Sequence, residues 1–209
     1  GYDAQLQYLF RATAISGVVG AGWYEVESDD LLLLIVPGPP PIPLSDGVFR
    51  TKQQNGYVYL NVLLGGRIMT TLGASYDSVS SDQSNLDINE FSPKLGLQWD
   101  AAPGLRLRAA AFDTTKRALL INQTIEPTQV AGFNQFFDDL DGTRAHSLAF
   151  AVDMVHKKGL YSGLEAHRRR LEVPTFAAGN IIEENRSDDE YRAYLYWVPH
   201  PRWSYSADY

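Results

Sequence analysis

Cysteine is absent from the 209 residues, which excludes disulfide scaffolds, thiol catalysis and cysteine-based zinc sites and leaves the redox compartment open. Long apolar runs are also missing: the longest, Leu31 to Val36, ends at Pro37 and is far shorter than the roughly 18 to 20 residues of a transmembrane helix. Positive charge is scarce, because 18 Lys and Arg stand against 25 Asp and Glu, a formal net charge of −7. Membrane-spanning helices and a nucleic-acid partner are therefore excluded.

Enzyme signatures are equally scarce. The four histidines, His146, His156, His167 and His200, do not have the spacing of metal ligands, and there is no Gly-x-Ser-x-Gly nucleophile elbow. The glycines between Gly17 and Gly22 have the wrong spacing for a dinucleotide-binding loop. We therefore expect no enzyme, no catalytic residue, no metal site and no cofactor.

The composition is that of one folded unit, with 44% hydrophobic and 21% charged residues. We expect a single domain over residues 1–209. The first five residues lack a basic start followed by an apolar stretch, so we expect no signal peptide here and a chain that is mature, cleaved or cut from something longer.

Alternation of apolar and polar residues dominates the chain and predicts β-strands. Leu105 and Leu107 have one parity while Arg106 and Arg108 have the other, so a strand there places both guanidinium groups on one face. The same pattern predicts ten strands, at about 5–13, 18–28, 55–64, 67–79, 91–100, 105–116, 144–156, 160–173, 187–198 and 203–209.

The connections between these strands alternate in length. Long loops are expected at about 29–54, 80–90, 117–143 and 174–186, and tight turns between the other pairs. Short turns at one end and long loops at the other, joined by strands of about ten residues, are typical of an antiparallel transmembrane β-barrel of the bacterial outer membrane. A soluble β-sandwich or a lipocalin-like barrel, which also alternates, is the alternative.

The tight turns Gly65-Gly66, Pro103-Gly104, the turn ending at Gly159 and Pro199 to Pro201 should then share one rim, with Phe133 to Asp141 at the other. If the turns are periplasmic, both chain ends lie on the outer side. A complete barrel begins and ends in the periplasm, so we expect a fragment of a larger barrel, of about twelve strands or more.

Two segments carry a family resemblance. Residues Phe91 to Asp100, the turn at Pro103-Gly104 and Leu105 to Phe112 resemble a hairpin of TonB-dependent receptor barrels, and Thr124 to Asp139 resembles the barrel region of outer-membrane proteins with periplasmic tetratricopeptide repeats. The resemblance implies an outer-membrane transport barrel for solute uptake or passage. A polymer-export porin with helical repeats, a non-conducting interaction barrel and, least favoured, an outer-membrane hydrolase are the alternatives.

The polar parity of the strands predicts the wall of a lumen. Its candidate residues are Arg11, Lys94, Gln98, Arg106, Arg108, Asp153, Glu165, His167, Arg169 and Arg192. They either select an anionic solute along an open path or form structural pairs, with Arg106 and Arg108 bound to Asp153 or Glu165.

Three further partners are expected. Outer-membrane lipid should cover the face of the strands that carries the apolar side chains. The apolar, proline-rich stretch from Leu31 to Leu44 should rest on something, either as a lid or against a partner subunit, or it simply extends a strand to a proline stop. Carboxylates in the expected loops, such as Asp138-Asp139 and Glu183-Glu184, could hold divalent cations, although solvated loops explain them as well.

Overall fold

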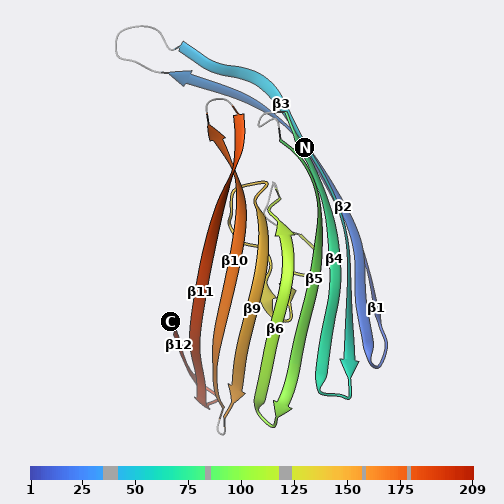
Figure 1. Cartoon of the computed structure of the whole chain (residues 1–209), viewed down its shortest axis with the longest axis vertical. Helices are drawn as coiled ribbons and strands as arrows, with labels where there is room; N and C mark the ends of the chain where they lie inside the picture. The colour runs from blue at the N-terminus through green and yellow to red at the C-terminus, as the bar shows by residue number, and fades with distance from the viewer. Residues whose placement is uncertain (35–41, 83–85, 118–123, 157–158, 178–179) are drawn as a thin grey trace.

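The computed structural model of the chain is all-β and describes residues 1–34, 42–82, 86–117, 124–156, 159–177 and 180–209 (Figure 1). Ten strands form one antiparallel sheet in which each strand pairs with its neighbours along the chain. They are β1 (Tyr2–Arg11), β2 (Ile15–Leu34), β3 (Ile42–Leu64), β4 (Ile68–Ser81), β5 (Leu86–Ala102), β6 (Leu105–Thr115), β9 (Arg144–Val155), β10 (Leu160–Ala177), β11 (Asn180–His200) and β12 (Trp203–Asp208).

A two-residue pair, β7 (Gln129–Val130) and β8 (Phe133–Asn134), forms a separate small hairpin between β6 and β9. The large sheet is strongly curved, and within the described residues β1 and β12 are not neighbours, so these ten strands do not close on themselves. No helix long and apolar enough to cross a membrane occurs in the described part of the chain.

The predicted fold class is confirmed, and all ten predicted strands are present. The expected loops at 29–54 and 174–186 differ, because β2 with β3 and β10 with β11 continue as long two-stranded ribbons through most of these segments. The segment 80–90 is likewise mostly strand, since β4 ends at Ser81 and β5 begins at Leu86. The sequence of the β2 extension, Asp29-Asp30 followed by four leucines, does not alternate between apolar and polar residues, so the alternation rule did not identify it as a strand.

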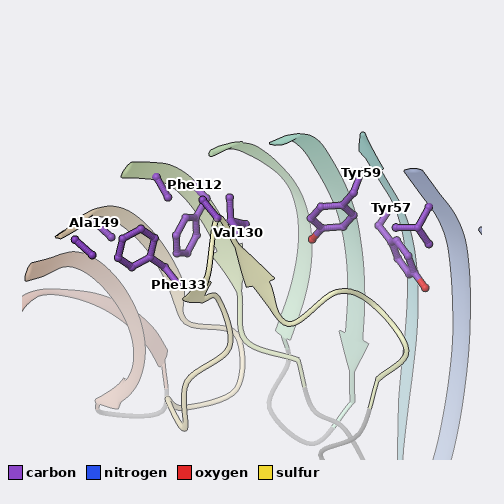
Figure 2. Packing of buried hydrophobic residues seen from close by; sticks show 10 residues of the cluster. Tyr57, Tyr59, Phe112, Val130, Phe133 and Ala149 are labelled. Carbon is purple, nitrogen blue, oxygen red and sulfur yellow. The ribbon is translucent and has the colours of Figure 1, made fainter. Parts of the chain in front are cut away.

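Register fixes two faces of the sheet. We call the face that carries Tyr59, Lys94 and Arg108 the concave face, and the face that carries Leu95 and Leu107 the convex face. Concave-face residues are largely buried: Tyr59 is 2% exposed and Lys94 4%. Their burial comes from residues 116–143 between β6 and β9, named here the inward loop, whose described part lies inside the curve of the sheet (Figure 2).

The tight turns lie together at one end of the sheet, as Figure 1 shows for β3–β4, β5–β6 and β11–β12. Gly65, Gly66 and Gly104 have φ values of 57°, 70° and 78°, which glycine adopts without steric cost. The prediction that Phe133 to Asp141 would lie at the opposite rim is wrong for Phe133. This side chain is buried on the concave face, 4.7 Å from ring centre to the Arg108 guanidinium, because apolar loop residues gain by leaving water.

The convex face presents an apolar band with aromatic residues at both borders. On β5, Phe91 and Trp99 end the outward-facing run, and about eight residues at about 3.3 Å each separate them by about 26 Å, close to the height of an outer-membrane apolar band. Leu97, Phe150 and Leu164 in this band are 42%, 55% and 65% exposed. Such a band would be a liability in water and suits lipid.

Leu95→Arg should therefore lower the free energy of unfolding by about 2 to 4 kcal/mol, the cost of placing a guanidinium at the bilayer midplane. Leu95 lies halfway between Phe91 and Trp99 on β5, and its side chain is 52% exposed on the convex face. Unfolding in lipid vesicles, followed by tryptophan fluorescence, measures the change. Leu140→Arg, at a leucine of the inward loop that is 58% exposed, is the control with little expected effect. Equal stability of the two variants would contradict a lipid-facing Leu95.

The stretch from Leu31 to Leu44 was expected to form a lid or a partner contact. The backbone belongs to β2 up to Leu34 and to β3 from Ile42, while residues 35–41 and the side chains of this stretch lie outside the described residues.

Candidate functional site

All ten residues predicted to line a lumen have concave-face register. Arg11 lies on β1, and Lys94 and Gln98 lie on β5. The remaining seven are spread over β6, β9, β10 and β11: Arg106, Arg108, Asp153, Glu165, His167, Arg169 and Arg192. They form several separate groups on this face. Arg11, on the edge strand β1, is remote from the other nine residues. Their role as a lumen wall stays a prediction.

Arg108 forms the centre of one group. Its Nε donates to Asp153 at 2.6 Å, and Nη2 donates to Asp153 at 3.0 Å and to Glu165 at 3.2 Å. The hydroxyl of Tyr194 donates to the same Asp153 carboxylate at 2.5 Å. Arg108 is thus held in the structural pairing that the sequence left open as one of two alternatives.

Arg106 and Arg192 are also paired, but with acids that the sequence did not suggest. Arg106 Nε donates to Asp100 at 2.7 Å, across the β5–β6 hairpin, and Arg192 Nη2 donates to Asp208 at 2.6 Å, across β11 and β12. The acids Asp100 and Asp208 neutralise these guanidinium groups. Exposed positive charge on this part of the concave face is consequently small.

The inward loop crosses the concave face from β10 to β1. At the β1 side, Gln7 Nε2 donates to the backbone carbonyl of Ile125 at 2.6 Å, and the amide of Ile125 donates to Gln5 at 3.0 Å. At the other side, Phe137 packs against His167, with ring centroids 5.6 Å apart. A single loop therefore bridges strands that are far apart in the sheet.

Buried charges anchor the middle of this loop. Arg117, only 4% exposed, donates to Asp77 of β4 at 2.6 Å and pairs with Glu126 farther along the loop. The Tyr59 hydroxyl donates to Glu126 at 2.6 Å, and Gln135 donates to Tyr59 at 2.8 Å. Each buried charge in this group has an opposite partner, as burial requires.

Arg117 is charged at any ordinary pH. Burial alone would lower its pKa, but attraction to Glu126 and then to Asp77 outweighs burial and raises the pKa above the ordinary value. The ring of Phe136 adds a cation–π contact, with the guanidinium carbon 5.4 Å from the ring centroid. The guanidinium of the anchor therefore keeps its charge on a change of pH in the neutral range.

The hairpin β7–β8 packs most tightly on the wall. Val130 and Phe133 are 0% and 1% exposed, and they join Phe112 and Ala149 of the sheet in one apolar cluster (Figure 2). Its turn comes close to β5, where a Cβ added to Gly96 would lie 2.8 Å from the Cβ of Ala131. Glycine at position 96 is therefore what allows this approach.

Gly96→Val should push the hairpin off the wall and lower the free energy of unfolding by about 1 to 3 kcal/mol, a typical cost of overpacking. Gly56→Val is the matched control, since a Cβ there meets only the Gly20 carbonyl oxygen at 4.0 Å. Urea unfolding of both variants measures the difference, and limited proteolysis at residues 124–134 reports whether the loop has detached. An unaffected Gly96→Val protein would show that the close approach is not required.

Arg169 and His167 hold the loop near its return to β9. Arg169 pairs with Asp139 of the loop and donates to Asp188 of β11 at 3.4 Å, and its guanidinium carbon lies 3.8 Å from the centroid of Phe137. His167, 5% exposed, is surrounded by Phe112, Phe133 and Phe137. This histidine therefore serves packing.

Several of the acidic residues considered for divalent cations are engaged by arginines. Asp189 pairs with Arg168, Glu183 with Arg144, and Glu184 with Arg186. Within the described residues, no group of three or more His, Asp or Glu side chains is arranged to hold a metal ion. Burial, together with the neighbouring Asp138, raises the pKa of Asp141, and Lys116 acts in the opposite direction.

The anchor residues Asp77, Arg117, Glu126 and Gln135 were not singled out from the sequence. The available signal was weak: Asp77 has concave-face parity in a strand otherwise rich in serine and small residues, and Glu126 follows a stretch without periodicity. What these residues do together is to hold a folded loop in the interior of the curved sheet. That arrangement narrows the space that a closed barrel would enclose.

Comparison with known proteins agrees with this architecture. Residues 1–166 match the family model for the TonB-dependent receptor-like β-barrel. Similar solved structures include the alcaligin outer-membrane receptor FauA of Bordetella pertussis (TM-score 0.58, 15% identity), FpvAI in complex with a pyocin (0.60, 16%) and the ferric enterobactin receptor PfeA of Pseudomonas aeruginosa (0.63, 15%). Each alignment covers 99% of this chain but only 37%, 32% and 34% of the respective structure. No curated protein sequence matches the chain.

Proposed function

This chain belongs to the TonB-dependent receptor-like β-barrel family of the bacterial outer membrane, and we propose that it carries a solute across that membrane through a lumen narrowed by the inward loop. The observation that carries the proposal is the loop itself, which runs from β10 to β1 across the concave face and is held there by buried ion pairs. A loop bound to the inner wall limits what passes beside it.

The matched structures suggest a solute class. Two of them are receptors for alcaligin and for ferric enterobactin, so a ferric chelate is the first solute to test. The chain spans about a third of the length of these structures, and the solute belongs to the whole protein. Among the concave-face residues predicted for the lumen, Lys94, His167 and Arg169 are buried, so the more exposed ones, such as Arg106 and Arg192, would line the path around the loop.

Narrowing by the loop is testable with bulky residues on its exposed surface. Gln129 and Asn134 are exposed on the β7–β8 hairpin and hydrogen-bond each other at 3.2 Å. Asn134→Trp in the full-length protein should reduce single-channel conductance in a planar bilayer, because the ring projects into the remaining space. Leu97→Trp, on the lipid-facing side, should leave the conductance unchanged. Absence of any conductance in the folded wild-type protein would refute passage.

A non-conducting interaction barrel is the second candidate. The pairing of Arg106, Arg108 and Arg192 with carboxylates favours it, because those charges are then structural. In that case, charge reversal at Arg108 would destabilise the barrel without changing ion selectivity.

A further inference from the structure

One row of side chains on the convex face changes its character between β9 and β10. Cross-strand register aligns Leu72, Leu95, Ala111 and Leu148 on β4, β5, β6 and β9. The next residue of this row, on β10, is Arg168. One step farther from the tight turns, Asp113, His146 and Arg170 form a polar row on β6, β9 and β10. The border of the apolar band therefore crosses β9 and β10 at this point.

A groove runs along β6 on the side of this border that is nearer to the tight turns. The convex-face residues of β6 there are Ala109 and Ala111, while taller side chains stand on both neighbours: Leu95 and Leu97 on β5, and Leu148 and Phe150 on β9. Two hollows follow the groove. One of about 510 Å³ includes Ala111 and reaches Arg168 and Arg170, and one of about 740 Å³ includes Ala109 and Leu97.

Cationic groups stand at the polar end of the groove. Arg168 uses Nε and Nη2 on Asp189, at 2.6 and 2.9 Å, which leaves its other guanidinium N–H donors available. Arg170 is exposed and forms no ion pair with the described residues. His146 Nδ1 lies 2.8 Å from Asp113 Oδ1, so that carboxylate already has a partner.

We propose that this groove binds one molecule of a phosphorylated membrane lipid, with its phosphate on Arg168 and Arg170 and one acyl chain along Ala111 and Ala109. A guanidinium group matches a phosphate in both charge and planar hydrogen-bond geometry. An acyl chain fills the space that the two alanines leave between taller neighbours. The inference concerns the lipid-facing side and does not depend on transport.

The position of the groove favours a lipid over a soluble ligand. The part of the groove at Ala109 is apolar and lies within the convex band, which faces the bilayer. Only the end near Arg168 and Arg170 meets the polar surface. A free phosphate would gain nothing from the alanine groove, and a lipid without a phosphate would gain nothing from Arg168 and Arg170. The two halves act together only on a molecule that has both parts.

Native mass spectrometry of the full-length protein in a neutral maltoside detergent tests this. Dioleoyl phosphatidic acid is the probe, dioleoylglycerol supplies the same chains without phosphate, and inorganic phosphate supplies the anion alone. We expect one retained phosphatidic acid, and at least tenfold weaker retention of both other probes. Arg168→Ala with Arg170→Ala should reduce phosphatidic acid retention about tenfold, and so should Ala111→Trp, which fills the groove and keeps both arginines.

Arg50→Ala is the control, because Arg50 is an exposed arginine that pairs with Glu27, remote from the groove on β3. It should retain the lipid like the wild type. Heat-modifiable migration on gels shows that each variant is folded. Equal retention of phosphatidic acid by the wild type and the double arginine variant would overturn the headgroup site, and equal retention by Ala111→Trp would overturn the acyl groove.

Discussion

Arg117→Ala should lower the free energy of unfolding by about 3 to 5 kcal/mol, because it leaves Asp77 and Glu126 as buried carboxylates without their cation. Both acids are almost fully buried, at 1% and 2% exposed, so water cannot replace the guanidinium. Urea unfolding of the refolded protein in detergent measures the loss. Arg50→Ala, at an exposed ion pair with Glu27, should leave stability nearly unchanged.

A compensated variant separates the cost of unpaired charge from the loss of packing. Adding Asp77→Asn and Glu126→Gln to Arg117→Ala removes both orphaned charges and keeps the shapes of the two acids. We expect much of the stability to return. If the triple variant is as unstable as the single one, the anchor works through packing against Phe136 and not through charge.

Excision of residues 118–141, with a short Gly-Ser linker in their place, should raise single-channel conductance of the full-length protein several-fold. The segment contains the hairpin β7–β8 and Glu126, which occupy the concave face from β3 to β10. Removing it widens the path, and Arg117 is kept so that Asp77 retains its ion pair.

The excised protein must first pass a folding test, since the apolar cluster around Phe112 loses Val130 and Phe133. Heat-modifiable gel migration and unchanged strand content by circular dichroism provide it. A folded, excised barrel with wild-type conductance would show that the inward loop does not limit passage. Arg117→Ala links the two experiments, because a loop released from its anchor should raise conductance in the same direction.

Strand positions and the two faces of the sheet were available from the sequence because a strand's side-chain period is local. Leu107 and Arg108 reveal their opposite faces by parity alone, and register then followed from tight turns such as Pro103-Gly104. The family resemblance rested on the same local patterns. In the segment 29–34 of β2, two aspartates are followed by four leucines, so parity carried no signal and the prediction became a loop.

The inward loop was decided only by the tertiary structure. Its contacts join residues distant in sequence, such as Tyr59 with Glu126, 67 residues apart, and Gln5 with Ile125, 120 apart. The segment 117–143 has no periodicity, and such a sequence does not distinguish a solvent-exposed loop from a loop packed against the sheet. Which acid neutralises Arg106 was equally undetermined, since Asp100 and Asp153 both share its face and side-chain packing selects between them. Burial and charge pairing depend on contacts between residues that are distant in the sequence. The folded sheet therefore determines the arrangement of the site, and local sequence patterns do not.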